Sequence, residues 1–177
     1  DRRIALYLGI YDNGNGYLDD RDMSQSCTST LIGARVLLTA AHCLYSHERG
    51  GWPTWFGVVP GANGNISIRD VIWAEWIYVP EGWVSTEDPF YDFGLIILSP
   101  SDSVGRQVGN LPIGVLNDRS LSSRNLWATT IGYPADKPAG TQWITAVPSI
   151  DAFNDDFFTS QLDQTHGQSG SAVFRAS

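Results

Sequence analysis

The sequence contains no long hydrophobic run. A membrane-spanning helix needs roughly 18 consecutive apolar residues, and the apolar stretches of this 177-residue chain are much shorter. Its first residues, DRRIALYLGIY, also lack the basic start, apolar stretch and small-residue cleavage site of a signal peptide. These absences predict a mature soluble protein with no membrane partner.

Basic residues are scarce as well. Lys and Arg together number 11 against 19 Asp and Glu, which gives a formal net charge of −8. Affinity for nucleic acids depends mainly on Lys and Arg that neutralise phosphates, so this charge excludes DNA, RNA and anionic membranes as partners. Hydrophobic residues make up 42% of the chain and aromatic residues 12%, which is enough for a buried core and argues against disorder.

Only two cysteines are present, Cys27 and Cys43. A lone pair can form a disulfide, remain as two separate thiols or contribute to a metal site, and composition does not choose among these. Zinc bound by both cysteines with His42 and His47 is one alternative. Asn65 begins an Asn-Ile-Ser sequence, the acceptor pattern for N-glycosylation, but this short pattern is common by chance.

Sustained helical periodicity is missing, and the short segment TAAHCLYS is the best helical fragment. Short runs rich in Val, Ile, Thr and aromatic residues recur between Gly, Pro, Asn and Asp, a pattern typical of antiparallel strands. Such runs include IALYLGIY, CTSTLIG, RVLLTA, WFGVVPG, NISIRDVIW, EWIYVP, FGLIILS, LPIGVL, LWATTIGYP, TQWITAVPSI, DFFTSQL and SAVF. The sequence therefore predicts an all-β fold with long connecting loops and an internal boundary at residues 99–110.

An acidic segment near the start, DNGNGYLDDRD, has two interpretations. Oxygen atoms of Asp12, Asn15, Asp19 and Asp20 could bind calcium. The spacing departs from that of an EF-hand loop, and no helical pattern flanks it. A Gly/Asn turn between two strands is the favoured interpretation.

Three separated segments carry the residues that a serine hydrolase needs: LLTAAHC with His42, DPFYDFGLIIL with Asp92, and THGQSGSAV with Ser169. A serine hydroxyl requires a base to take its proton, and histidine is suited to this near neutral pH. A carboxylate on the far ring nitrogen fixes the tautomer. The chain order His, Asp, Ser and the sequence GQSGS both exclude the α/β-hydrolase pattern.

These segments, read as LTAAHC, YDFGLIIL and GQSGSAV in that order, resemble the corresponding segments of the chymotrypsin-like serine proteases. TTIGYPADKPAGTQW followed by GQSGSAVF is similar to the glutamyl endopeptidase branch, although that branch usually has Pro before the Val. The resemblance implies His42 as the base, Asp92 as the orienting acid and Ser169 as the nucleophile. It also implies an oxyanion hole made of the Gly167 and Ser169 N–H groups.

The resemblance further implies two antiparallel β-barrels of the chymotrypsin type. Residues 1–99 would form the first barrel with the His and the Asp, residues 100–110 a connecting loop, and residues 111–177 the second barrel with the Ser. A Cys27–Cys43 disulfide, which in this family braces the loop with the catalytic His, implies a secreted protein. Asp88 is the weaker alternative to Asp92 as the orienting acid, because it is followed by Pro89 and not directly by an apolar strand.

We expect the residues before the nucleophile to line the substrate pocket, namely Asp163, Gln164, Thr165 and His166. A carboxylate of Asp163 at the pocket floor would bind Arg or Lys, whereas the glutamyl branch prefers an acidic side chain, with which His166 could pair. Gln168 stands where trypsin-type enzymes have an Asp that pairs with a freed amino terminus. The active state should therefore not depend on that ion pair.

The predicted function is a secreted serine endopeptidase with a polypeptide substrate, an acyl-enzyme intermediate, and no cofactor or metal. The alternative is a protease-like binding or regulatory chain without activity. Only eight residues follow Ser169, whereas this fold usually continues with further strands. We therefore expect an incomplete second barrel, with a separate C-terminal chain as the piece that completes it.

Overall fold

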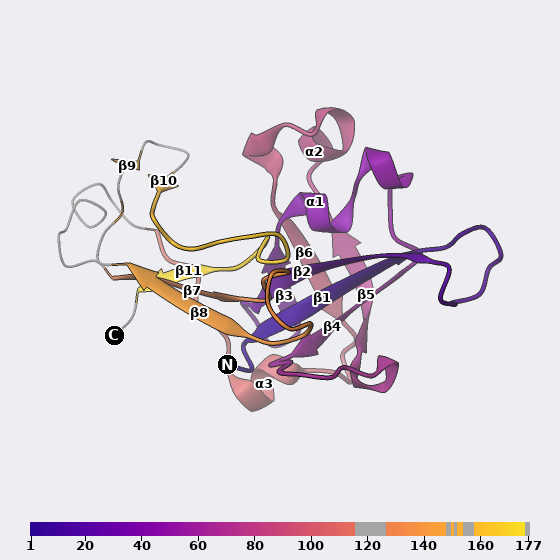
Figure 1. Cartoon of the computed structure of the whole chain (residues 1–177), viewed down its shortest axis with the longest axis horizontal. Helices are drawn as coiled ribbons and strands as arrows, with labels where there is room; N and C mark the ends of the chain where they lie inside the picture. The colour runs from indigo at the N-terminus through magenta and orange to yellow at the C-terminus, as the bar shows by residue number, and fades with distance from the viewer. Residues whose placement is uncertain (116–126, 148–149, 151, 154–157, 176–177) are drawn as a thin grey trace.

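A computed structural model describes residues 1–115, 127–147, 150, 152–153 and 158–175. Its strands form two groups that lie side by side, a barrel built from the first hundred residues and a smaller sheet built from the last fifty (Figure 1). The all-β prediction is confirmed, with a closed six-stranded barrel and a second sheet of three strands.

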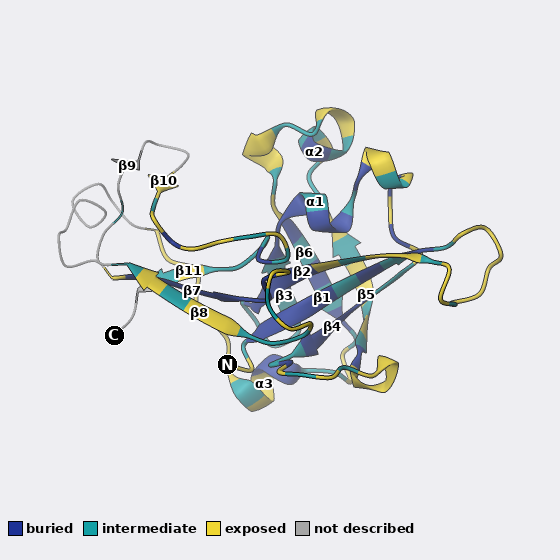
Figure 2. Cartoon of the chain, viewed as in Figure 1, coloured by how far each residue is buried: buried dark blue, intermediate teal, exposed yellow. Residues whose placement is uncertain are grey.

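The barrel closes in the order β1-β2-β3-β6-β5-β4, and every neighbouring pair is antiparallel. Its strands are β1 (Ile4–Tyr11), β2 (Met23–Leu31), β3 (Val36–Thr39), β4 (Trp55–Pro60), β5 (Ile72–Tyr78) and β6 (Gly94–Leu98). Alternate residues point inward, as in β6, where Ile96 and Leu98 are fully buried and Ile97 between them is partly exposed. Buried residues are concentrated along the strands of the barrel (Figure 2), and their side chains form one apolar cluster.

The smaller sheet has the order β11-β7-β8, with β7 (Ala128–Gly132), β8 (Trp143–Val147) and β11 (Val173–Arg175). A separate two-stranded ladder joins β9 (Ala152–Phe153) to β10 (Phe158–Thr159). All five residues of β7 are buried, which explains why its sequence, ATTIG, does not alternate between apolar and polar residues.

Strand β1 packs on both of its faces. Ala5 and Tyr7 belong to the core inside the barrel. Ile4 and Leu6 belong to a second apolar cluster that includes Ile131 at the end of β7. Burial of apolar surface on both faces therefore holds the two strand groups together, and this contact sets the position of the site described below.

The short helices are α1 (Ala41–Leu44), α2 (Glu81–Thr86) and α3 (Val104–Val108), with 3-10 turns at η1 (His47–Arg49), η2 (Ile68–Asp70) and η3 (Pro89–Tyr91). The expected connecting segment, residues 99–110, contains the short helix α3. A Cβ at Gly105 would come within 2.2 Å of the Gly33 carbonyl oxygen, so the glycine permits close packing on the β2–β3 turn. The strand expected at LPIGVL is absent from residues 111–115.

The acidic segment between β1 and β2 is an exposed turn. The Asp12 carboxylate accepts the backbone N–H groups of Gly14, Asn15 and Gly16, and the Asp22 carboxylate accepts those of Asn13 and Asp19. The carboxylates thus stabilise the turn itself, which confirms its predicted place between two strands. In the described part of the chain, no helix is long and apolar enough to cross a membrane.

Candidate active site

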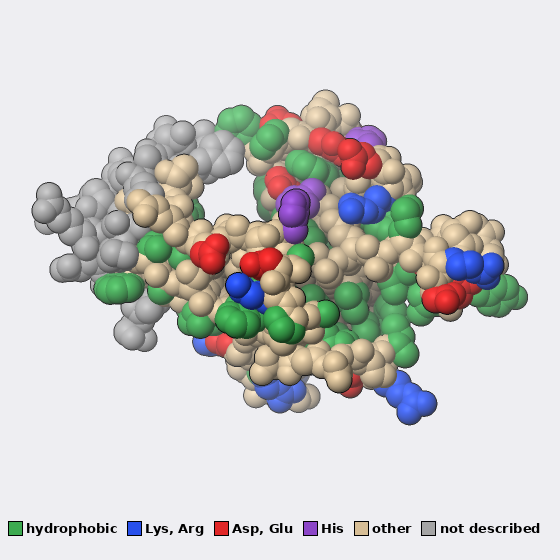
Figure 3. Space-filling model, viewed as in Figure 1, with side chains coloured by type: hydrophobic (Ala, Val, Ile, Leu, Met, Phe, Trp, Pro, Cys, Tyr) green, Lys and Arg blue, Asp and Glu red, His purple; other side chains and the backbone are tan. Residues whose placement is uncertain are grey.

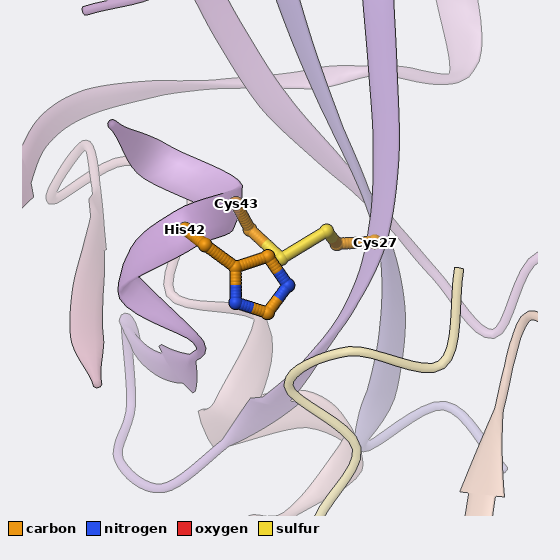
Figure 4. A group of neighbouring side chains, drawn as sticks. All are labelled: Cys27, His42 and Cys43. Carbon is orange, nitrogen blue, oxygen red and sulfur yellow. A yellow bond between two sulfur atoms is a disulfide. The ribbon is translucent and has the colours of Figure 1, made fainter. Parts of the chain in front are cut away.

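His42 lies on α1, a single helical turn that follows β3 directly. The next residue, Cys43, forms a disulfide with Cys27 of β2, so α1 is covalently tied to the neighbouring strand (Figure 4). The bond closes a segment of 16 residues, which contributes about 3 kcal/mol on a chain-entropy estimate. The predicted disulfide is therefore present, and it lies beside the His42 ring.

Asp92 binds His42 with both carboxylate oxygens. Oδ2 lies 2.8 Å from the ring Nδ1, and Oδ1 accepts the His42 backbone N–H at 2.9 Å. Burial by itself would raise the pKa of Asp92, but the hydrogen bonds from the ring and backbone of His42 and from the Ala41 backbone outweigh it and lower the pKa below 3.8. The ionised carboxylate therefore keeps the proton on Nδ1 and leaves Nε2 free as a base.

Asp88, the rival acid, has a different role. Its carboxylate accepts the backbone N–H of Phe90 at 3.0 Å and caps η3, the turn that ends at Tyr91 directly before Asp92. It is thus part of the local structure that presents Asp92.

The loop with Ser169 requires glycine at two positions. Gly167 and Gly170 have φ angles of +88° and +82°, a region that favours glycine. A Cβ at Gly167 would lie 2.3 Å from the Tyr133 carbonyl oxygen, and one at Gly170 would lie 2.3 Å from the Thr28 carbonyl oxygen. Both glycines therefore permit close contact, the first with the end of β7 and the second with the barrel.

The Ser169 backbone places the loop next to the His42 helix. Its carbonyl accepts the Thr28 N–H of β2 at 2.9 Å and lies 3.9 Å from the Cys43 sulfur. The structure thus brings the predicted histidine and serine segments together from the two strand groups. No hydrogen bond joins the Ser169 hydroxyl to His42 within the described residues, and such contacts often tighten only when substrate binds.

Two backbone donors next to the serine are unpaired. Neither the Gly167 N–H nor the Ser169 N–H has an acceptor among the described residues. The preceding carbonyl, that of His166, accepts the Ala135 N–H at 2.7 Å. Because N–H and C=O point in opposite directions in a trans peptide, this bond directs the Gly167 N–H away from Ala135. Two such free donors can stabilise an oxyanion.

A hollow of about 310 Å³ lies beside Ser169, and its lining includes Gln164, Thr165 and His166. Asp163 is exposed and lies instead along a separate small hollow with Asp136, Lys137 and Trp143. This second hollow shares Thr165 and Gln168 with the first. Three of the four expected pocket residues therefore line the hollow at the serine, and Asp163 lies along the adjoining one. On the face in Figure 3, Lys and Arg side chains lie singly rather than in a patch.

Gln168, which directly precedes Ser169, is buried. Its side-chain oxygen accepts the Thr165 N–H at 2.8 Å, and its own N–H donates to the Thr165 carbonyl at 3.1 Å. The side-chain oxygen and the backbone N–H of Gln168 thus both form hydrogen bonds with Thr165 inside the loop. These bonds, and no ion pair to an amino terminus, stabilise the loop at this position.

The zinc alternative does not fit the cysteines. Ligand atoms of Cys27, His42 and Cys43 lie within 4.8 Å of one another, but the two sulfurs are bonded to each other and offer no thiolate. His47 is engaged elsewhere, since its ring stacks edge-on with Tyr45 and its backbone N–H donates to Glu87.

A closed antiparallel barrel, a second sheet against it and a His–Asp pair near a serine loop define the class of chymotrypsin-like serine proteases. The chain belongs to the trypsin family, which matches residues 12–177. The predicted resemblance to this class, near its glutamyl endopeptidase branch, is confirmed.

Two curated relatives show where the chain lies within the family. Glutamyl endopeptidase of Bacillus licheniformis is 35% identical over 156 residues, which are 86% of this chain and 46% of that protein. A protein of Bacillus subtilis named extracellular metalloprotease is 32% identical over 84% of this chain and 46% of its own length. The chain thus spans about half the length of the curated relatives it matches.

A solved structure of a Glu endopeptidase in complex with MPD is also similar. It has a TM-score of 0.75 and 26% sequence identity, over 98% of this chain and 74% of that one. The likeness therefore extends over both strand groups.

Proposed function

We propose that this chain carries the catalytic machinery of a secreted serine endopeptidase. Ser169 Oγ attacks the carbonyl carbon of a peptide bond while His42 Nε2 takes its proton, and Asp92 stabilises the resulting imidazolium. The N–H groups of Gly167 and Ser169 bind the oxyanion of the tetrahedral intermediate. His42 then protonates the leaving amine, an acyl-enzyme remains, and water hydrolyses it by the same steps in reverse.

The observation that carries this proposal is the two-point bond between His42 and Asp92, next to a serine loop with two unpaired N–H groups. A partly buried carboxylate held on the far ring nitrogen has a clear purpose if the near nitrogen acts as a base. Secretion is part of the proposal and is supported by the disulfide, because such bonds persist in oxidising compartments.

A fluorophosphonate inhibitor tests this function without knowledge of the substrate. We expect intact-mass analysis of the native protein to show one adduct, and peptide mapping to place it on Ser169, because only an activated serine reacts. A folded, full-length protein that gains no adduct would support the alternative of a binding or regulatory chain without activity.

We also propose that the enzyme cleaves after acidic residues. The 35% identical relative is named glutamyl endopeptidase. In addition, the hollow beside Ser169 has no carboxylate among its described lining residues, whereas His166 borders it. A substrate Arg or Lys would find no ionic partner in this hollow, and an acidic side chain would find an imidazole.

The variant Asp163→Asn distinguishes a preference for acidic residues from a preference for Arg or Lys. Because this carboxylate is exposed and outside the hollow, we expect kcat/KM for acidic substrates to stay within about twofold, as for most surface substitutions. Asp136→Asn, in the same small hollow as Asp163, is the matched control. Cleavage after Arg or Lys on a peptide library, lost in Asp163→Asn alone, would contradict the proposed preference.

A further inference from the structure

Thr28 of β2 lies in the barrel but contacts the serine loop. It follows Cys27 in the chain and has no solvent-exposed surface. Its neighbours across space belong to β3, to the end of β7 and to the Ser169 loop. The backbone N–H, the backbone carbonyl and the hydroxyl of Thr28 can all form hydrogen bonds to these segments.

Four hydrogen bonds converge on this residue. The Thr28 hydroxyl donates to the Gly167 carbonyl at 2.9 Å and accepts the Tyr133 N–H at 3.0 Å. Its backbone N–H donates to the Ser169 carbonyl at 2.9 Å, and its carbonyl accepts the Thr39 hydroxyl at 2.7 Å. Thr28 thus binds the carbonyls of the two residues whose own N–H groups are unpaired.

We infer that Thr28 is a positioning residue that fixes the oxyanion-binding N–H groups of Gly167 and Ser169. This inference rests on the proposed function. Glycine lacks the Cβ that restricts backbone rotation in other residues. Without further bonds, the peptide planes on either side of Gly167 could therefore rotate. The Thr28 bonds to the Gly167 and Ser169 carbonyls hold the 167–168 and 169–170 peptides on the barrel, and these two peptides flank the one that carries the Ser169 N–H. The carbonyl of that middle peptide, at Gln168, accepts the Ser171 N–H at 2.9 Å. The Ala135 bond to His166 restrains the peptide on the other side of Gly167.

The hydroxyl is suited to this role because it donates and accepts at once. Valine has nearly the same shape but neither ability, so Thr28→Val leaves a buried carbonyl and a buried N–H unpaired. Such groups are costly, and the loop would have to move to satisfy them. Serine keeps the hydroxyl and loses only a methyl group.

The strand offers a matched control. Thr30 lies two residues further along β2, is also buried, and its hydroxyl has no partner among the described residues. Thr30→Val therefore makes the same chemical change in the same strand without breaking a hydrogen bond.

The test compares the rate of phosphonylation by a fluorophosphonate in the full-length protein and its variants, with inactivation rate and inhibitor affinity measured separately. We expect Thr28→Val to lower the maximal rate about 10- to 100-fold, as small displacements of catalytic groups can do, with little change in affinity. Thr28→Ser should restore the rate, and Thr30→Val should stay within about twofold of the unsubstituted protein. Thermal unfolding confirms that the compared proteins are folded.

Equal rates in folded Thr28→Val and the unsubstituted protein would overturn the inference, as would an equal loss in Thr30→Val or a failure of Thr28→Ser to recover. If Thr28→Val does not fold, Thr39→Val tests the same assembly. It removes the hydrogen bond to the Thr28 carbonyl and should slow labelling about 5-fold, the factor typical of one lost hydrogen bond, and an unchanged rate would refute the inference. Unsubstituted protein that is not labelled refutes the proposed function itself, and the inference with it.

Discussion

Ser169→Ala is expected to lower peptide hydrolysis about a million-fold while the protein stays folded, because the nucleophile and its base act as one unit. Alanine removes only the hydroxyl. The loop keeps its backbone contacts, since those of residue 169 run through its carbonyl to Thr28. The residual rate would reflect the remaining oxyanion donors and substrate binding.

The measurement is kcat/KM on a library-selected peptide, with thermal unfolding as the check on folding. Ser103→Ala is the control, because Ser103 lies before α3, away from the serine loop, and among the described residues its hydroxyl binds the Pro100 carbonyl alone. Substantial activity in a purified Ser169→Ala protein would mean that another nucleophile performs the reaction.

Asp92→Asn should lower kcat about 10⁴-fold, the loss expected when the histidine takes the wrong tautomer. Asp92 accepts two hydrogen bonds from His42, one from Nδ1 and one from the backbone N–H. An amide has one acceptor oxygen, so its NH₂ group would face a second donor unless the ring moves its proton to Nε2. The base would then be blocked. Asp88→Asn is the control, because asparagine also caps a helical turn, and comparable losses in both variants would contradict the assignment of Asp92.

The His42–Asp92 pair also predicts how the stability of the protein depends on pH. The pKa of Asp92 is below its usual 3.8 in the folded state, so its contribution to stability is complete above about pH 5 and is lost as the pH falls through the folded pKa. We expect wild type to be more stable than Asp92→Asn at pH 5 and above. This difference in melting temperature should shrink below pH 3.8, and a difference that stays constant down to pH 2 would contradict it.

Much of the first barrel and of the candidate site could be predicted because the signals are local. β1, β3, β4 and β6 each lie within a short apolar run, and His42, Asp92 and Ser169 lie in short sequences with a recognisable order. Helix α3 could not be predicted in this way. It forms where Gly105 packs against the β2–β3 turn, and this contact joins residues more than 70 positions apart in the chain.

The residues that support the site also lacked a signal in the sequence. Thr28 and Ala135 act through hydrogen bonds to the Ser169 loop, which is far from both in the chain. Nothing in a single threonine after a cysteine, or in an alanine after a proline, predicts such bonds. Asp163 had a signal, its distance from Ser169 in the chain, but the fold places it along another hollow.

The disulfide joins two segments of the chain that lie next to the site. Cys43 directly follows the general base, and its partner Cys27 directly precedes Thr28. One covalent bond therefore restrains both the helical turn with His42, the proposed base, and the strand with Thr28, the residue proposed to position the Ser169 loop. If the chain is the proposed secreted protease, its active site would be fully braced only after the two cysteines are oxidised outside a reducing compartment.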